Sequence, residues 1–178
     1  DTVGILATAR KIDLATLQPA IKLLESWGLH VVIGKTIGIE ENQLAGADWF
    51  RATDFQEMLD NPNIKAIWAA KGGYGTVRIV DRIDFTNFKK HPKWVIGFSD
   101  MTVMHSHINN MDIATLHAIM AISVRTATPE AIEYIAQKGY DPQFGARPVK
   151  RVIQREVLNQ LSKEILAGNI ATESIILL

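Results

Sequence analysis

The sequence predicts an α/β protein with a mostly parallel sheet and helices on both faces, extended by a C-terminal β-α-α-β fragment. Over the first two-thirds of the chain, short apolar runs of strand length alternate with amphipathic stretches of helix length. The apolar runs contain few polar residues, which is typical of strands covered on both faces. Strands separated by helices of this length imply right-handed βαβ crossovers and therefore a parallel sheet.

The elements of this region follow one another in a regular order. Strands are predicted at residues 3–7, 30–34, 66–70, 93–98 and 113–118. Helices are predicted at residues 17–27, 50–59 and 75–81, with a further helix that begins near residue 100. Gly28 and the Asn61-Pro62 pair are typical helix ends. Together these elements predict Rossmann- or flavodoxin-like layers.

The pattern changes near residue 121, which divides the chain into residues 1–120 and 121–178. We expect a strand at residues 122–125, helices at 128–138 and 147–167, and a closing strand at 174–178. Thr128 as N-cap and Pro129 at the first helical position mark the start of the first helix. Residues 120–124 are nearly all apolar, so we expect Ile122 and Val124 to lie in a strand added to the sheet, or against it, and both parts to pack as one unit.

Composition excludes several classes of protein. Nineteen basic and nineteen acidic residues give 178 residues a formal net charge of zero, so neither nucleic acid nor a membrane surface is expected as a partner. The absence of cysteine excludes disulfides, thiolate metal sites and a cysteine nucleophile, and no metal or cofactor is expected. No apolar run approaches the roughly 20 residues that span a bilayer, and no signal peptide is evident. We therefore expect a cytoplasmic protein.

Two segments that follow predicted strands are candidates for chemistry. Adjacent glycines in Lys71-Gly72-Gly73-Tyr74-Gly75 permit a sharp turn with free N–H groups, which suits either an oxyanion site or a simple strand-to-helix turn. In Gly97-Phe98-Ser99-Asp100 a serine sits where a strand passes into a helix. The serine hydroxyl can act as a nucleophile beside an oxyanion-stabilising amide, or Ser99 or Asp100 can merely cap the helix.

Five strings, in order, resemble the N-terminal domain of the LD-carboxypeptidases, serine peptidases that trim muropeptides and include the microcin-immunity branch. The strings are V-G-I-L-A-T-A-R, A-I-K-L-L-E-S-W-G-L, A-A-K-G-G-Y-G-T-V-R-I-V-D, W-V-I-G-F-S-D-M-T-V-M-H-S-H-I-N-N and T-L-H-A-I-M. The resemblance covers roughly residues 1–120. It implies that Ser99 is the nucleophile, and that Gly73 and the amide of Asp100 form the oxyanion hole. The family commonly has Arg where Lys71 stands.

The second part resembles the C-terminal small domain of Clp-type AAA+ disaggregases, above all in the string G-Y-D-P-Q-F-G-A-R-P. The resemblance implies that Arg147 corresponds to the sensor-2 arginine, which reaches the nucleotide phosphates. That role depends on a P-loop, and G-x-x-x-x-G-K-[ST] occurs nowhere in this sequence. Arg147 is therefore expected to be a surface or helix-start arginine.

Neither of the two parts of the chain is expected to supply the family's base for Ser99. In the LD-carboxypeptidase family the general-base histidine and its orienting glutamate come from a C-terminal domain, which is not expected here. His105 and His107 lie on the helix after Ser99, which carries them away from it. His117, at a strand end, is the best local candidate for a weak base.

These observations predict an engineered chimera with a structural role and no efficient activity. The alternative is a residual serine hydrolase that acts on peptidoglycan peptides through Ser99, with His117 or water as base. Nucleotide binding through Arg147 is the least favoured function. A weak peptide ligand near Gly72, Gly73 and Ser99 is compatible with the first two hypotheses.

Overall fold

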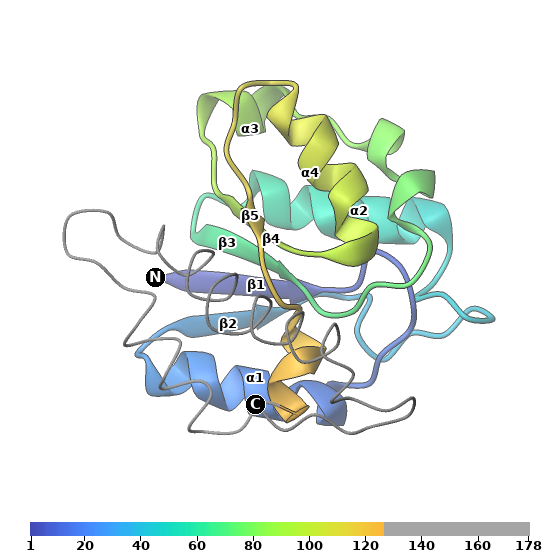
Figure 1. Ribbon diagram of the computed structural model, residues 1–178, viewed down its shortest axis with the longest axis vertical. Helices are drawn as coiled ribbons and strands as arrows, with labels where there is room; N and C mark the ends of the chain where they lie inside the picture. The colour runs from blue at the N-terminus through green and yellow to red at the C-terminus, as the bar shows by residue number, and fades with distance from the viewer. Residues whose placement is uncertain (127–178) are drawn as a thin grey trace, which may run out of the picture. The chain divides into compact units, whose positions relative to one another are not determined.

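Parallel strands form a sheet in residues 1–126, the part of the chain that the computed structural model describes. The strands are β1 (Thr2–Leu6), β2 (His30–Ile33), β3 (Ile64–Ala69), β4 (Trp94–Gly97) and β5 (Leu116–His117). Their order in the sheet is β2-β1-β3-β4-β5, and every pair is parallel (Figure 1). This is the flavodoxin-like order, in which the connections reverse direction between β1 and β3. The predicted parallel α/β sheet is confirmed.

Helices cover both faces of this sheet. They are α1 (Leu14–Ser26), α2 (Asp48–Asp60), α3 (Thr86–Lys90) and α4 (Thr102–Asn109). Side chains alternate between the two faces of a strand, and on β1 Leu6 joins a core cluster with Phe55 of α2, Phe88 of α3 and Met104 of α4. Helix α1 lies against the opposite face, where Ile5 points (Figure 1).

Local signals account for the bounds of α1. The carboxylate of Asp13 accepts hydrogen bonds from the backbone N–H of Thr16 at 2.7 Å and from its hydroxyl at 2.8 Å, which satisfies a free amide of the first turn. At the other end, Gly28 has φ +75°, the left-handed conformation that commonly follows a helix. The predicted helix end at Gly28 is therefore confirmed.

Two predicted elements are shorter or of another type in the structure, and one helix is additional. The predicted helix at residues 75–81 is replaced by two 3₁₀ segments, η1 (Thr76–Arg78) and η2 (Val80–Arg82). The predicted strand at residues 113–118 is reduced to the two residues of β5. The short helix α3 was not predicted, because five residues are too few to show a helical period.

The strand predicted at residues 122–125 is wrong. Residues Ala121–Thr126 form a 3₁₀ helix, η4, in which the amide of Ile122 donates to the carbonyl of Ala70 at 3.0 Å. The chain therefore crosses the end of β3 instead of running beside a strand. The alternative expectation, that these residues pack against the sheet, is met by Ile122, which is half-buried against the core cluster, and Val124 is buried. Asp1–Arg125 forms one compact unit, and the elements predicted at residues 128–178 lie outside the described residues.

No helix within residues 1–126 combines the length and apolar character that crossing a membrane requires.

Candidate functional site

The candidate site lies at the carboxyl ends of β1, β3 and β4, where three loops meet. Residues 7–10 follow β1, residues 70–75 follow β3, and Phe98 leads from β4 into the 3₁₀ segment η3 (Ser99–Met101). Strands β1 and β3 are the neighbours between which the connections reverse direction, the usual position of a ligand site in an open parallel sheet.

Ser99 occupies a sharp and strained turn. Its φ is +57°, a left-handed backbone conformation that costs a non-glycine residue about 1–2 kcal/mol. Its side chain is exposed. Gly97, two residues earlier, permits the turn, because a Cβ atom there would lie 2.8 Å from Cγ of Met101. A serine held in strained backbone at the end of a strand is the geometry of a nucleophile elbow.

The carboxylate of Asp100 joins this elbow to the glycine turn. Its Oδ2 accepts hydrogen bonds from the backbone N–H of Thr76 at 2.9 Å and from the Thr76 hydroxyl at 2.6 Å. Since the hydroxyl proton of Thr76 goes to the carboxylate, the hydroxyl of Thr8, 2.8 Å away, donates to Thr76. Asp100 thus does not cap its own helix, as the sequence had suggested it could. It holds the start of η1 against the elbow.

The turn at Gly72 and Gly73 is crowded on both sides. A Cβ atom on Gly72 would lie 2.7 Å from Cε of Met120, and one on Gly73 would lie 2.5 Å from Cγ of Arg10. Gly73 also has φ +118°, which disfavours any other residue. Its N–H donates to no acceptor among residues 1–126. A free amide at this position is what an oxyanion site requires.

Arg51 on α2 is a buried residue of the site that the sequence analysis did not single out. Its side chain is fully buried and donates to the carbonyl oxygens of Thr8 and Gly75, the latter at 3.0 Å, and to Asp48. Burial lowers the pKa of the guanidinium, while the Asp48 carboxylate opposes that shift. Its position four residues before Phe55, on the apolar stripe of α2, is the signal that could have indicated its burial.

The histidines lie near the elbow without bonding to Ser99. The buried ring of His105 has Nε2 2.9 Å from the carbonyl oxygen of Gly97, so Nε2 carries the proton and donates. Its Nδ1 has no hydrogen-bond partner in the described part of the chain. Burial and the neighbouring His117 lower the pKa of His105, although the bond to Gly97 acts in the other direction.

His117 lies beside the elbow strand. It pairs with Gly97 in the sheet, and its ring lies 5.7 Å from that of His105 and 6.4 Å from that of Phe98. Among residues 1–126 no histidine forms a hydrogen bond with the Ser99 hydroxyl. The structure therefore brings Ser99, Asp100 and Gly72-Gly73 together and shows no bonded base, and Arg147 lies outside the described residues.

Within residues 1–126, no three His, Cys, Asp or Glu side chains are grouped so that they could hold a metal ion.

Comparisons with known proteins divide the chain in two. Residues 3–118 match the family model described as LD-carboxypeptidase N-terminal domain, and residues 116–178 match the C-terminal, D2-small domain of ClpB protein. A chaperone protein ClpB from Bdellovibrio bacteriovorus is 66% identical over 41 residues, which make up 23% of this chain and 5% of the chaperone.

The carboxypeptidase relatives are longer than the matched part. A probable murein peptide carboxypeptidase from Bacillus subtilis is 41% identical over 121 residues, 67% of this chain and 38% of the relative. The chain thus spans about two fifths of the length of that curated relative.

Solved structures show the same fold. The microcin C7 self immunity protein MccF, 22% identical, aligns with a TM-score of 0.72 over 78% of this chain and 42% of its own. A muramoyltetrapeptide carboxypeptidase from Oxalobacter formigenes, 24% identical, aligns with a TM-score of 0.67 over 80% of this chain and 49% of its own. The serine elbow, the glycine turn beside it and the family match over residues 3–118 together show that this chain belongs to the LD-carboxypeptidase family.

Proposed function

We propose that the protein is an engineered chimera, in which the nucleophile domain of an LD-carboxypeptidase is joined to a small domain of ClpB type, and that it has no efficient native activity. The two family matches overlap only at residues 116–118, so the change of family is internal to the chain. Each part matches a fraction of its relatives' length. On this proposal the role of the chain is structural.

The first part retains the binding half of a serine-peptidase site. In acyl transfer, the Ser99 hydroxyl would attack a carbonyl carbon, and the oxygen of that carbonyl would gain negative charge. The amides of Gly73 and Asp100 would stabilise this charge, and removing one such donor typically costs about 3–4 kcal/mol of transition-state stabilisation. A short peptide with an exposed carbonyl is the ligand that fits beside Gly72, Gly73 and Ser99.

The argument against efficient turnover concerns the base that would have to activate the Ser99 hydroxyl. Attack by serine requires a base within about 2.6–3.2 Å of the hydroxyl, oriented by a third group. The single observation behind the proposal is that an exposed, strained Ser99 has no histidine bonded to it within residues 1–126.

Two assays test this proposal. We expect no hydrolysis of an L,D-peptide bond above the background of the uncatalysed reaction, and only slow labelling by a fluorophosphonate probe at neutral pH. Ser106→Ala, which removes an exposed serine of α4, serves as the control. Turnover that Ser99→Ala abolishes and Ser106→Ala preserves would overturn the proposal.

The alternative is a residual serine hydrolase in which His117 acts as a weak base. The observation in its favour is that His117 pairs with Gly97 on the adjacent strand and its ring packs near Phe98. If this alternative holds, the probe labels Ser99 faster than it labels an exposed serine such as Ser106, and His117→Gln removes that excess. Labelling that is unchanged in His117→Gln excludes it.

Nucleotide binding through Arg147 is not proposed, because the sequence contains no P-loop. We expect a calorimetric titration with ATP to show no saturable heat at millimolar concentration. A clear binding heat that Arg147→Ala abolishes would contradict this.

A further inference from the structure

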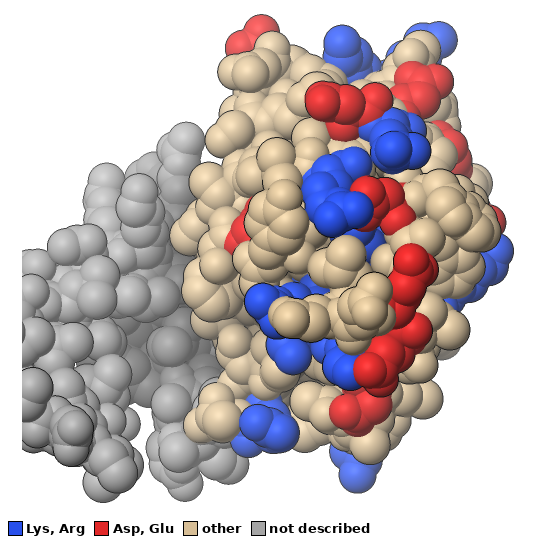
Figure 2. Space-filling model, turned by 90° about the vertical axis from the view of Figure 1, so that its right-hand side faces the viewer, with Lys and Arg blue, Asp and Glu red and all other residues tan. Residues whose placement is uncertain are grey.

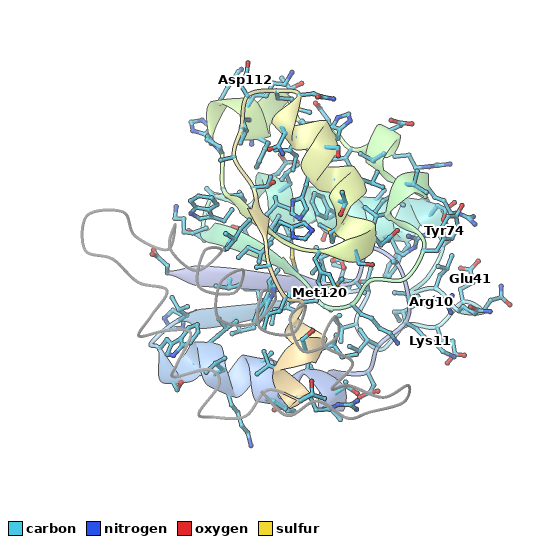
Figure 3. All side chains as sticks on the ribbon, viewed as in Figure 1. Arg10, Lys11, Glu41, Tyr74, Asp112 and Met120 are labelled. Carbon is cyan, nitrogen blue, oxygen red and sulfur yellow. The ribbon has the colours of Figure 1, made fainter. Side chains whose placement is uncertain are left out.

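A cavity of about 600 Å³ opens beside Tyr74, the residue that follows the Gly72-Gly73 turn. Its walls come from the loop after β1, the loop before α2 with the first turn of α2, and the segment that follows β3. Its charged and aromatic side chains include Arg10, Glu41, Trp49, Tyr74, Arg78 and Arg82. Figure 3 shows Arg10, Glu41 and Tyr74 gathered at one end of the unit. We call this space the Arg10–Glu41 cavity.

One carboxylate of the cavity is already neutralised. Oδ2 of Asp48 pairs with Arg78, whose Nη2 lies 2.8 Å away, and Oδ1 pairs with the buried Arg51. The hydrogen bond from Arg78 lowers the pKa of Asp48 and raises that of Arg78. Because Asp48 and the two arginines already pair with one another, we treat them as part of the cavity wall and not as ligand-binding groups.

Three further charged groups line the cavity: Arg10, Arg82 and Glu41. Arg10 donates to the neutral amide of Gln43, and within the described residues neither Arg10, Arg82 nor Glu41 takes part in an ion pair. The cavity therefore presents two guanidiniums and one carboxylate that form no ion pair with one another. Figure 2 shows this side of the molecule, where positive and negative side chains lie next to one another.

Two aromatic side chains add an apolar wall. The side chain of Trp49 is 64% exposed and that of Tyr74 is 56% exposed, which is high for residues that usually bury most of their surface. Exposed Trp and Tyr rings provide large contact area at little cost in side-chain entropy. An aliphatic chain can lie along such a wall.

We propose that the Arg10–Glu41 cavity binds an amino-acid group that carries both a free ammonium and a free carboxylate. The carboxylate binds Arg10 and Arg82, the ammonium binds Glu41, and the aliphatic stem lies along Trp49 and Tyr74. A simple anion pairs with the two arginines and leaves Glu41 without a partner, and a simple cation pairs with Glu41 alone, whereas a zwitterion pairs with all three.

The cavity also borders the serine site. A Cβ atom on Gly73 would collide with Arg10, so Arg10 passes directly over the glycine turn. A zwitterion bound to Arg10 would therefore lie next to the glycine turn. The proposal concerns binding alone and holds whether or not Ser99 reacts.

Norleucine is a suitable probe because it combines both charges with a straight aliphatic stem. Binding is followed in the full chain by the indole N–H signal of Trp49 in NMR spectra, assigned with Trp49→Phe. We expect saturable binding in the millimolar range, at least tenfold stronger than that of N-acetylnorleucine or norleucinamide, each of which lacks one charge. No saturable shift, or equal affinity for the blocked compounds, overturns the proposal.

Charge variants distinguish binding at this cavity from a general electrostatic attraction to the protein surface. Glu41→Gln should weaken norleucine at least tenfold and remove the preference over N-acetylnorleucine, while Arg10→Gln or Arg82→Gln should remove the preference over norleucinamide. Glu40→Gln is the matched control, because Glu40 is the adjacent carboxylate, pairs with Lys11 and lines a different cavity. An equal loss in Glu40→Gln contradicts the proposal. Norleucine binding is read at Trp49 and probe labelling at Ser99, so failure at this cavity and failure at Ser99 are distinguishable.

Discussion

At the scale of single residues, the left-handed backbone conformation of Ser99 lowers the free energy of unfolding. A left-handed backbone is nearly free for glycine and costs other residues about 1–2 kcal/mol. We expect Ser99→Gly to raise the free energy of unfolding by about 1 kcal/mol, since the relief of strain outweighs the flexibility gained in the unfolded chain. Ser99→Ala keeps the Cβ atom and should give no such gain. Equal stabilities of the two variants in urea unfolding would contradict this.

His105 makes the stability of the compact unit depend on pH. Burial lowers its folded pKa below the ordinary value of 6.5, so the unfolded chain takes up the proton first. Stability should be fully present above pH 6.5 and decline as pH falls from 6.5 towards the lower folded pKa. His105→Gln, which keeps a donor for the carbonyl of Gly97, should flatten this decline in urea unfolding followed from pH 8 to 5. Ser106→Ala is the neighbouring control, and a slope unchanged in His105→Gln would refute the assignment.

At the scale of elements, Arg51 links α2 to two of the loops that build the site. It donates to carbonyl oxygens in the loop after β1 and in the glycine turn. Arg51→Met leaves those buried oxygens without donors, and we expect a loss of about 3 kcal/mol or more in the free energy of unfolding. Arg78→Met removes the other guanidinium bound to Asp48 but from an exposed side chain, and it should cost much less. Similar losses in both variants would show that Arg51 has no special role.

The outcome of sequence prediction for each element depends on how local its signal is. The strands at residues 3–7 and 66–70 were predicted within one or two residues, because an apolar run between turn residues is a local feature. Residues 122–125 gave the same signal, yet they form a 3₁₀ helix, because a hydrogen bond to Ala70 at the end of β3 decides their conformation. That contact joins distant parts of the chain and leaves no trace in the local pattern.

The same distinction applies to the site. Ser99 and the glycines are recognisable from their order in the sequence. The carboxylate of Asp100 was expected at its own helix, and its bonds to Thr76 depend on how two loops pack. The burial of Arg51 likewise depends on the loops around it, since an arginine is seldom fully buried.

At the scale of the whole molecule, the compact unit extends past the residue at which the sequence pattern changes. Ala121 and Val124 are buried within it, and the amide of Ile122 bonds to Ala70. A fragment of residues 1–126 should therefore exceed a fragment of residues 1–120 in unfolding free energy by about 2–3 kcal/mol, from one buried valine and one hydrogen bond. Equal stability of the two fragments in urea would contradict this. That residues 1–120 and 121–178 pack as one unit stays a prediction.

The position of β1 inside the sheet affects how the protein folds. Strand β1 is hydrogen-bonded to β2 on one side and to β3 on the other, and β3 begins only at Ile64. During synthesis, the edge of β1 that pairs with β3 therefore stays unpaired until β3 has been made. Unpaired strand edges of this kind promote aggregation. Pairing between such distant segments also slows folding, so the unit should refold over milliseconds to seconds and not microseconds. Refolding at low protein concentration, and rapid pairing of β3 with β1, would favour the native state over aggregates.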